Sequence, residues 1–139
     1  METTPTFSAK SLQYYVIAKS WASDLEFFKM ETSFLNRLLD EYFLRLYNRK
    51  LTDKVKGSGQ RLLCLAQNEV KVNHLICQQL KEMEWVAKNK IKENEERTSL
   101  LQVEIESRMV NIMCEFRDLK TDIFELVENI LRDERRAVN

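Results

Sequence analysis

His74 is the only histidine of the chain and lies three residues before Cys77. On a helix this spacing puts an imidazole and a thiolate on one face, where they could share a metal ion. A zinc site needs at least three protein ligands, and Cys64 lies several helical turns away from Cys77. A di-iron bundle needs Glu three residues before His, and Lys71 occupies that position. We predict no metal and no other cofactor, and interpret His74 as partly buried beside a core cysteine.

No residue set is typical of an enzyme. A Ser–His–Asp or Cys–His arrangement would have to use His74, and no local motif marks a nucleophile. The segment KGSG at 56–59 lacks the Gly-Lys-Ser/Thr ending of a phosphate-binding loop. Acidic clusters at 93–96 and 118–125 are explained as solvated helix faces and turns. We predict that the protein is not an enzyme.

Basic residues gather in two parts of the chain that an up-down-up helical path would bring to one end. They are Arg49, Lys50, Lys54, Lys56, Arg61, Arg132, Arg135 and Arg136. Such an end could bind nucleic acid or acidic membrane lipid. The simpler interpretation is that most of them occupy last helical turns, where positive charge complements the helix dipole. The 22 basic and 22 acidic residues cancel, so no overall field favours a polyanion.

The elements that would position these residues follow from the spacing of apolar side chains. Over residues 101–130 the apolar positions are Leu101, Ile105, Met109, Ile112, Phe116, Leu119, Ile123, Leu126 and Ile130. From Ile105 onward the steps alternate between four and three residues, an average of about 3.5. This is the period of a seam, the line of residues by which one helix packs along others.

The whole composition is that of an all-α protein. The chain has only two glycines and one proline, and 32% of its residues are charged. We predict helices over 7–50, 60–92 and 99–136, packed as an up-down-up bundle of three long helices with coiled-coil-like seams. Residues 51–59 hold both glycines and are predicted to be a loop. Residues 1–6 are predicted to be a flexible tail, and 7–139 a single domain.

Two boundaries have alternatives. The seam of the first helix is predicted to be Tyr14, Ile17, Trp21, Leu25, Phe28, Thr32, Leu35, Leu39, Tyr42 and Leu46. Ser23 and Glu26 have the spacing of a capping box, so the alternative to one long helix is a kink near Ser20–Asp24. The polar run 92–99 is predicted to be a turn, with Ser99 able to cap the next helix; the alternative is one continuous helix.

Apolar residues also lie outside the seams, and an isolated three-helix bundle could not cover all of them. We expect the following five to form a partner-binding surface: Phe27, Phe34, Phe43, Leu44 and Tyr47. Three polar residues, Glu69, Asn73 and Glu84, project onto the apolar arc of the second helix. They are interpreted either as buried groups that set register or as residues at the rim of the arc.

We therefore predict a non-enzymatic helical protein–protein interaction module, a subunit, scaffold or adaptor of a larger coiled-coil assembly. Its partners would be other helical chains or further copies of itself. In composition and seam the chain resembles small coiled-coil subunits of cytoskeletal, centrosomal, meiotic or membrane-tethering complexes, a resemblance that implies no residue roles. No apolar run is long enough for a transmembrane segment. Three cysteines, an odd number, are predicted to be buried free thiols, which indicates an intracellular location, cytoplasmic or nuclear.

Overall fold

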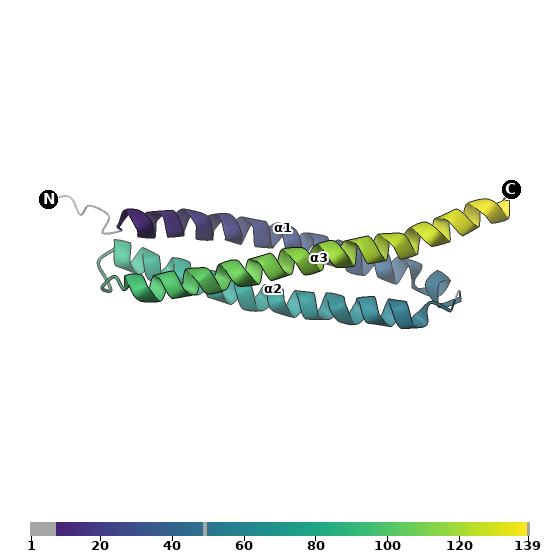
Figure 1. The fold of residues 1–139 in the computed structure, drawn as a ribbon, viewed down its shortest axis with the longest axis horizontal. Coiled ribbons are helices and arrows are strands. Elements are labelled where there is room, and N and C mark those ends of the chain that lie inside the picture. The colour runs from purple at the N-terminus through teal and green to yellow at the C-terminus, as the bar shows by residue number, and fades with distance from the viewer. Residues whose placement is uncertain (1–7, 49, 139) are drawn as a thin grey trace. The chain divides into compact units, whose positions relative to one another are not determined.

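The computed structural model describes residues 8–48 and 50–138, which form three α-helices and, within these ranges, no strand. The helices are α1 (Ala9–Asn48), α2 (Thr52–Ala87) and α3 (Glu95–Val138). The predicted all-α class is therefore confirmed. The chain divides into two compact units. Unit 1 contains residues 8–27 and 68–111, unit 2 contains residues 28–67 and 112–138, and each holds a segment of all three helices (Figure 1).

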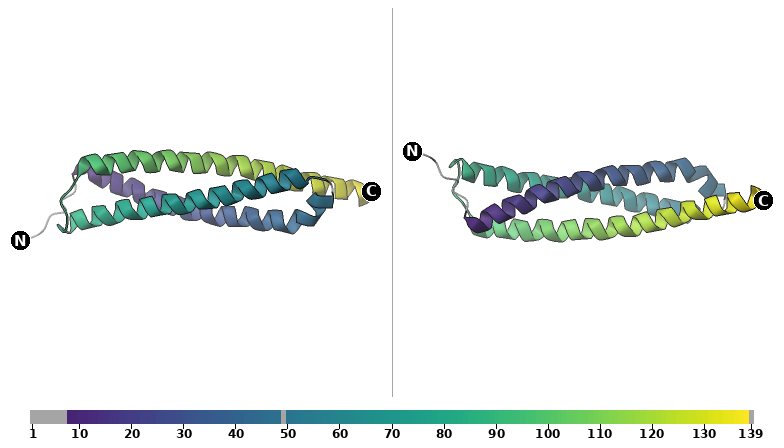
Figure 2. Two further views of the ribbon diagram at one scale, coloured as in Figure 1. Left: turned by 90° about the horizontal axis from the view of Figure 1, so that it is seen from below. Right: turned by 90° about the horizontal axis from the view of Figure 1, so that it is seen from above.

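The up-down-up direction of the helices holds in each unit. In unit 2, the rings of Phe28 and Phe116 meet edge to face at 5.5 Å, and Arg45 Nε lies 3.4 Å from Glu134 Oε1. The numbers rise together, so α1 and α3 run parallel. In unit 1, α2 runs antiparallel to α3, because Gln79 bonds to Gln102 while the earlier α3 residue Arg97 pairs with the later α2 residue Glu82. Further views show the same three-helix packing (Figure 2).

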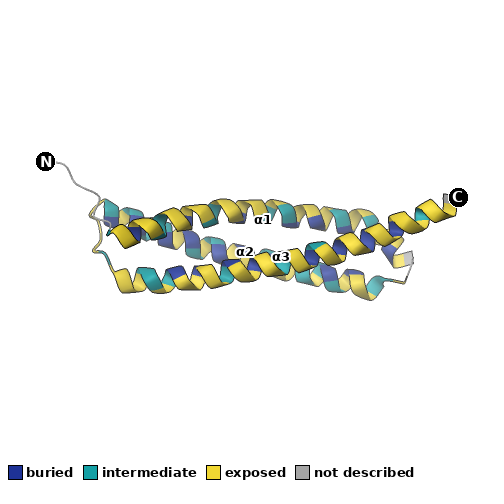
Figure 3. Cartoon of the chain, turned by 45° about the horizontal axis from the view of Figure 1, so that its top comes forward, coloured by how far each residue is buried: buried dark blue, intermediate teal, exposed yellow. Residues whose placement is uncertain are grey.

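α2 and α3 bury residues in alternating steps of three and four. α1 buries Ser11, Ala18, Leu25 and Thr32 at steps of seven, with half-buried residues between them. Dark blue segments recur along all three helices (Figure 3). The predicted seam of α3 is confirmed from Ile105 to Ile130, but Gln102 is buried one position after the half-buried Leu101. The buried positions of α2 are Val55, Ser58, Leu62, Leu65, Glu69, Val72, Ile76, Gln79, Met83 and Val86. Polar residues therefore occupy three of the seam positions of α2.

The seam of α1 differs from the prediction at one position. Ala18 is fully buried, whereas Ile17 is 43% exposed. The step from Tyr14 is therefore four residues and the step to Trp21 is three, which keeps the period of the other two helices. The helix runs without a break through Ser20–Asp24, so no second helix begins at Ser23.

The N-terminus of α1 begins with a side-chain cap. Ser11 N–H donates to Ser8 Oγ at 3.1 Å, which satisfies a backbone donor that has no partner within the helix. The prediction for residues 1–6 lies outside the described residues.

The loop predicted for residues 51–59 is wrong, because α2 already begins at Thr52. α1 instead ends in a tight C-terminal turn that leads directly into α2. Lys50 takes a left-handed conformation with φ 59°, its N–H donates to Tyr47 O at 3.0 Å, and Leu51 N–H donates to Leu46 O at 3.1 Å. These two bonds are the Schellman pattern, which normally uses Gly or Asn at the left-handed position.

Both glycines lie inside the helix because its first turns are part of the core. Val55 and Ser58 are buried, at 4% and 6% exposure, and neither Gly57 nor Gly59 has a positive φ. A helical glycine costs about 1 kcal/mol relative to alanine. Burial of Val55 in these first turns offsets this cost, which is why the glycines do not interrupt α2.

The predicted turn after α2 is confirmed, but it lies earlier than residues 92–99. The helix ends at Ala87 with a second Schellman pattern, in which Asn89 has φ 58° and Lys90 N–H donates to Trp85 O at 2.8 Å. Asn94 then caps α3, since its Oδ1 accepts the Arg97 N–H at 3.1 Å. Ser99, predicted as the cap, lies inside α3.

Candidate interaction surfaces

The five predicted partner-binding residues are all exposed, from 43% for Phe34 and Phe43 to 71% for Leu44, with Phe27 and Tyr47 between these values. Phe27 belongs to unit 1, and the other four belong to unit 2. The four residues of unit 2 lie on different sides of α1, and the position of Arg45 shows which side each occupies.

Arg45 marks the flank of α1 that lies beside α3, because its side chain reaches Glu134. Phe43 and Tyr47 are each two residues from Arg45, and two residues rotate a helix by about 200°. Both rings therefore lie on the flank of α1 turned away from α3, where they stack on each other at 6.2 Å. Leu44 is offset from both groups and lies on the outermost line of the helix.

Phe34 lies on the same flank as Arg45, because the steps from Phe34 to Leu38 and from Leu38 to Arg45 are four and seven residues. On α3, Glu134 marks the flank beside α1, and Val127 lies two turns before it. Phe124 and Leu131 are three or four residues from Val127, on the outer side of that flank. We call this surface of unit 2 the α1–α3 face and define it as Phe34, Leu38, Phe124, Val127 and Leu131.

The α1–α3 face combines exposed and buried apolar side chains. Phe34, Phe124 and Leu131 are 43%, 41% and 38% exposed, Leu38 is half-buried and Val127 is buried. The three exposed side chains of this face therefore belong to the same helix flanks as the half-buried Leu38 and the buried Val127, rather than being scattered singly over the surface. Lys120 Nζ lies 5.6 Å from the ring centroid of Phe124 and 5.8 Å from that of Phe116, which is cation–π distance.

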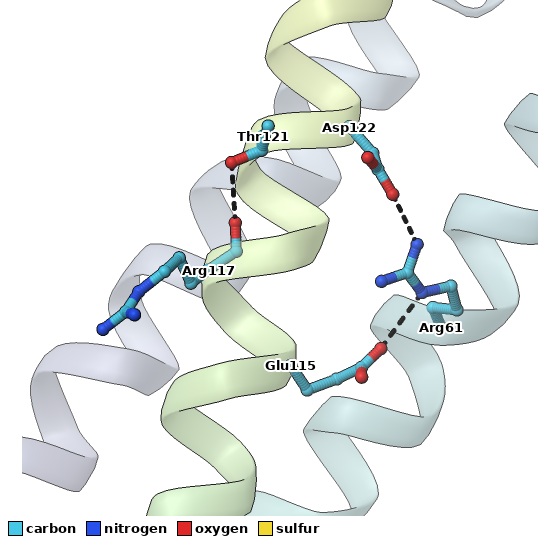
Figure 4. A network of polar contacts seen from close by, with 5 residues as sticks. All are labelled: Arg61, Glu115, Arg117, Thr121 and Asp122. Atoms are coloured by element: carbon cyan, nitrogen blue, oxygen red, sulfur yellow. Dashed lines mark hydrogen bonds and ion pairs between the residues drawn. The ribbon is translucent and has the colours of Figure 1, made fainter.

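The predicted basic end is partly neutralised inside the protein (Figure 4). Arg61 of α2 lies between two carboxylates of α3, with Nε 3.0 Å from Glu115 Oε1 and Nη1 2.7 Å from Asp122 Oδ2. The hydrogen bond that Arg61 donates to Asp122 is the main cause that raises the pKa of Arg61 above its usual value. Beside this group, Thr121 Oγ1 donates to the carbonyl oxygen of Arg117 at 3.0 Å.

The remaining basic residues of that end have different surroundings. Arg132 pairs with Glu128 at 3.5 Å. Lys50, Lys54, Lys56, Arg135 and Arg136 are exposed, and Arg49 lies outside the described residues. A cleft of about 360 Å³ beside Arg61 is lined by residues of both charges: Lys54, Gly57, Ser58, Arg61, Asp122, Glu125, Leu126 and Asn129. The chain therefore does not gather these residues into one uniformly positive surface.

The thiols and the histidine are placed differently from the prediction. Cys64, Cys77 and Cys114 are exposed, and so is His74. The prediction of buried thiols is wrong because none of the three occupies a seam position, and His74 likewise points outward from α2. Among the described residues, no group of three or more His, Cys, Asp or Glu side chains is placed to hold a metal ion.

A buried polar layer in unit 1 was missed by the sequence reasoning. Gln79 and Gln102 are 1% and 4% exposed. Gln79 Nε2 donates to Gln102 Oε1 at 3.0 Å and to Thr98 O at 2.9 Å, and Gln102 Nε2 donates to Tyr14 O at 3.0 Å. One layer thus joins all three helices. Their spacing in the sequence could have revealed them, because Gln79 lies three residues after Ile76 and Gln102 three residues before Ile105, both on the three-four spacing of buried positions.

Other polar residues complete this end of unit 1. Ser11 Oγ and Ser8 Oγ both donate to Glu93 Oε1, and Tyr15 OH donates to Glu84 Oε1 at 3.1 Å. Of the three polar residues expected on the arc of α2, Glu69 is buried, whereas Asn73 and Glu84 are half-buried at its rim. Burial is therefore confirmed for Glu69 alone, and whether it sets register stays a prediction.

Comparison of the chain with protein-family models, with curated proteins and with solved structures found no match. Over the described residues, none of the helices is both long enough and apolar enough to cross a membrane.

Proposed function

We propose that the protein is a non-enzymatic helical interaction module, a subunit or adaptor of a larger helical assembly, and that the α1–α3 face is its docking surface. The observation that carries the proposal is the grouping of Phe34, Phe124 and Leu131, each about two-fifths exposed, on one flank of unit 2. Interfaces draw most of their affinity from a few aromatic and aliphatic anchors surrounded by polar residues.

The kind of partner follows from the geometry of the face. Two parallel helices, α1 and α3, present a shallow line of apolar side chains between them, which suits the apolar stripe of another helix. Charged residues of both signs, among them Lys120 and Glu128, border this line and would fix the orientation of the incoming helix. Phe27, and separately Phe43, Tyr47 and Leu44, remain further proposed contacts on other parts of α1.

The exposed thiols suit a reducing environment, so a cytoplasmic or nuclear location is part of this proposal.

The test compares the wild-type chain with the double variant Phe34→Ser, Phe124→Ser. A hydrophobic dye, anilinonaphthalene sulfonate, is added at low protein concentration, and the oligomeric state is measured by sedimentation velocity. We expect the wild type to bind dye or to self-associate, and the double variant to lose that property. The matched control is Leu63→Ser, which removes a residue that is 60% exposed on α2. A wild-type chain that unfolds cooperatively, stays monomeric and binds no dye would contradict the proposal.

The alternative function, binding of nucleic acid or acidic lipid at the basic end, has less support because Arg61 and Arg132 already pair with carboxylates. It predicts binding that weakens steeply as salt is raised. Absence of binding to duplex DNA and to phosphatidylserine vesicles at about 50 mM salt, where such contacts are strongest, would end it.

A further inference from the structure

We infer that the partner docking on the α1–α3 face is a second copy of this chain, laid antiparallel so that Phe124 meets Phe124 of the second copy. This inference rests on the proposed function, because it names the occupant of the same surface. It follows from the order of side chains along the exposed flank of α3.

That flank has opposite charges on either side of Phe124. Lys120 lies four residues before Phe124 and Glu128 four residues after it. A four-residue step rotates a helix by about 40°, so all three side chains share one outward strip. Arg117 and Leu131, seven residues before and after Phe124, lie on the same strip.

A twofold axis through Phe124 makes this strip complementary to itself. In the antiparallel arrangement Lys120 faces Glu128 of the second copy. Glu128 already pairs with Arg132 of its own chain at 3.5 Å, but its side chain is 68% exposed and can accept a second cation. The symmetry repeats the contact with Lys120, giving two intermolecular ion pairs around a central aromatic pair. Arg117 lies beside Leu131 of the second copy, where its aliphatic stem can cover the leucine. A parallel arrangement would instead oppose Lys120 to Lys120 and Glu128 to Glu128, which is repulsive at both ends.

The size of the face is sufficient for a dimer. The strip extends from Met113 to Arg135, about 33 Å at 1.5 Å per residue. With α1 alongside, the face is two helices wide, about 20 Å. It therefore offers about 660 Å² per copy and about 1,300 Å² in total, within the range of specific interfaces. Phe34 and Leu38 of α1 provide the second apolar row, which α3 alone would lack.

The experiment is a charge exchange measured by sedimentation velocity and light scattering on the full chain. Lys120→Glu and Glu128→Lys are made singly and together. We expect a wild-type dimer, weakening of the dimer by about tenfold or more in each single variant, and recovery in Lys120→Glu, Glu128→Lys, because exchanged charges attract again across the axis. The matched control is Lys71→Glu, an exposed lysine of α2 in unit 1, which is expected to leave the dimer unchanged. Circular dichroism confirms that each variant is folded.

The outcomes separate this inference from the proposed function. A wild-type monomer whose dye binding depends on Phe34 and Phe124 would keep the docking surface and overturn the dimer. A dimer that tolerates Lys120→Glu, or that the double exchange does not restore, would overturn the antiparallel register. If the wild-type chain neither binds the dye nor associates, both proposals are overturned together.

Discussion

The buried layer of Gln79 and Gln102 allows a sharp prediction, because each buried amide depends on the other for a hydrogen bond, which apolar core residues do not. Both amides are almost fully buried, and their contacts join α2 to α3 and α3 to α1. Replacing one partner and replacing both should have opposite consequences. Buried polar groups are costly when left alone and inexpensive when removed together.

The single change Gln102→Leu removes the hydrogen bonds to Gln79 and to Tyr14 O. Each bond contributes about 0.5–1.5 kcal/mol net, so the loss is about 1–3 kcal/mol before the gain from burying leucine. We expect the free energy of unfolding to fall by about 1–2 kcal/mol, and the Tm by about 3–7 °C for a chain of this length. Gln79 keeps its bond to Thr98 O.

The double change Gln79→Leu, Gln102→Leu removes both amides and fills the layer with apolar side chains. Paired replacement is often neutral or stabilising, so we expect stability to return to within about 0.5 kcal/mol of the wild type, or above it. Gln79→Leu alone also removes two hydrogen bonds and should cost about as much as Gln102→Leu, so the pair would show a coupling energy of about 2–4 kcal/mol, the sum of the two single losses.

The assay is urea denaturation followed by circular dichroism at 222 nm, with Val103→Ala as control because Val103 is 63% exposed on α3. A stabilising single variant would refute the reasoning, and so would a double variant whose loss equals or exceeds the sum of the two single losses.

Three further predictions address the connections and the surface. Gly57→Ala and Gly59→Ala should each raise the free energy of unfolding by about 0.5–1 kcal/mol in the same assay, because both glycines are helical and an added methyl group would meet no atom within 4 Å; a loss of stability in either would show that the segment is not helical. Lys50→Gly should stabilise the chain by about 1 kcal/mol in thermal unfolding, because glycine has no steric penalty at the positive φ of that position, whereas no change would argue against the left-handed stop. In the native protein a thiol reagent should react, without denaturant, with all three exposed cysteines, Cys64, Cys77 and Cys114. A cysteine that reacts only after unfolding would contradict this exposure.

The heptad spacing predicted most of the fold, and its limits have physical causes. The seam of α3 from Ile105 to Ile130 was readable because every position in it is apolar and most of the residues between these positions are polar. The α2 seam was obscured by Ser58, Glu69 and Gln79, which are polar by type and core by position. A count of apolar residues cannot find such positions, whereas the three-four spacing can.

The glycine segment shows a second limit. Gly57 and Gly59 indicate a loop when only local propensity is considered, but burial of Val55 and Ser58 outweighs two unfavourable residues. The connection that does exist depends on Lys50 at a left-handed position, where sequence preference would favour glycine or asparagine. Of the proposed α1–α3 face, only Phe34 was among the residues predicted from the sequence. Phe124 and Leu131 belong to a helix distant in sequence, so spacing along the chain does not group them with Phe34.

The link between α2 and α3 has a practical consequence. Residues 88–92 are exposed, and the next residue, Glu93, accepts hydrogen bonds from Ser8 and Ser11. Lengthening a surface connection costs only about 0.6 kcal/mol per doubling. A fluorescent reporter or an affinity tag could therefore be inserted after Lys90, leaving both Schellman stops, the Asn94 cap and the α1–α3 face undisturbed.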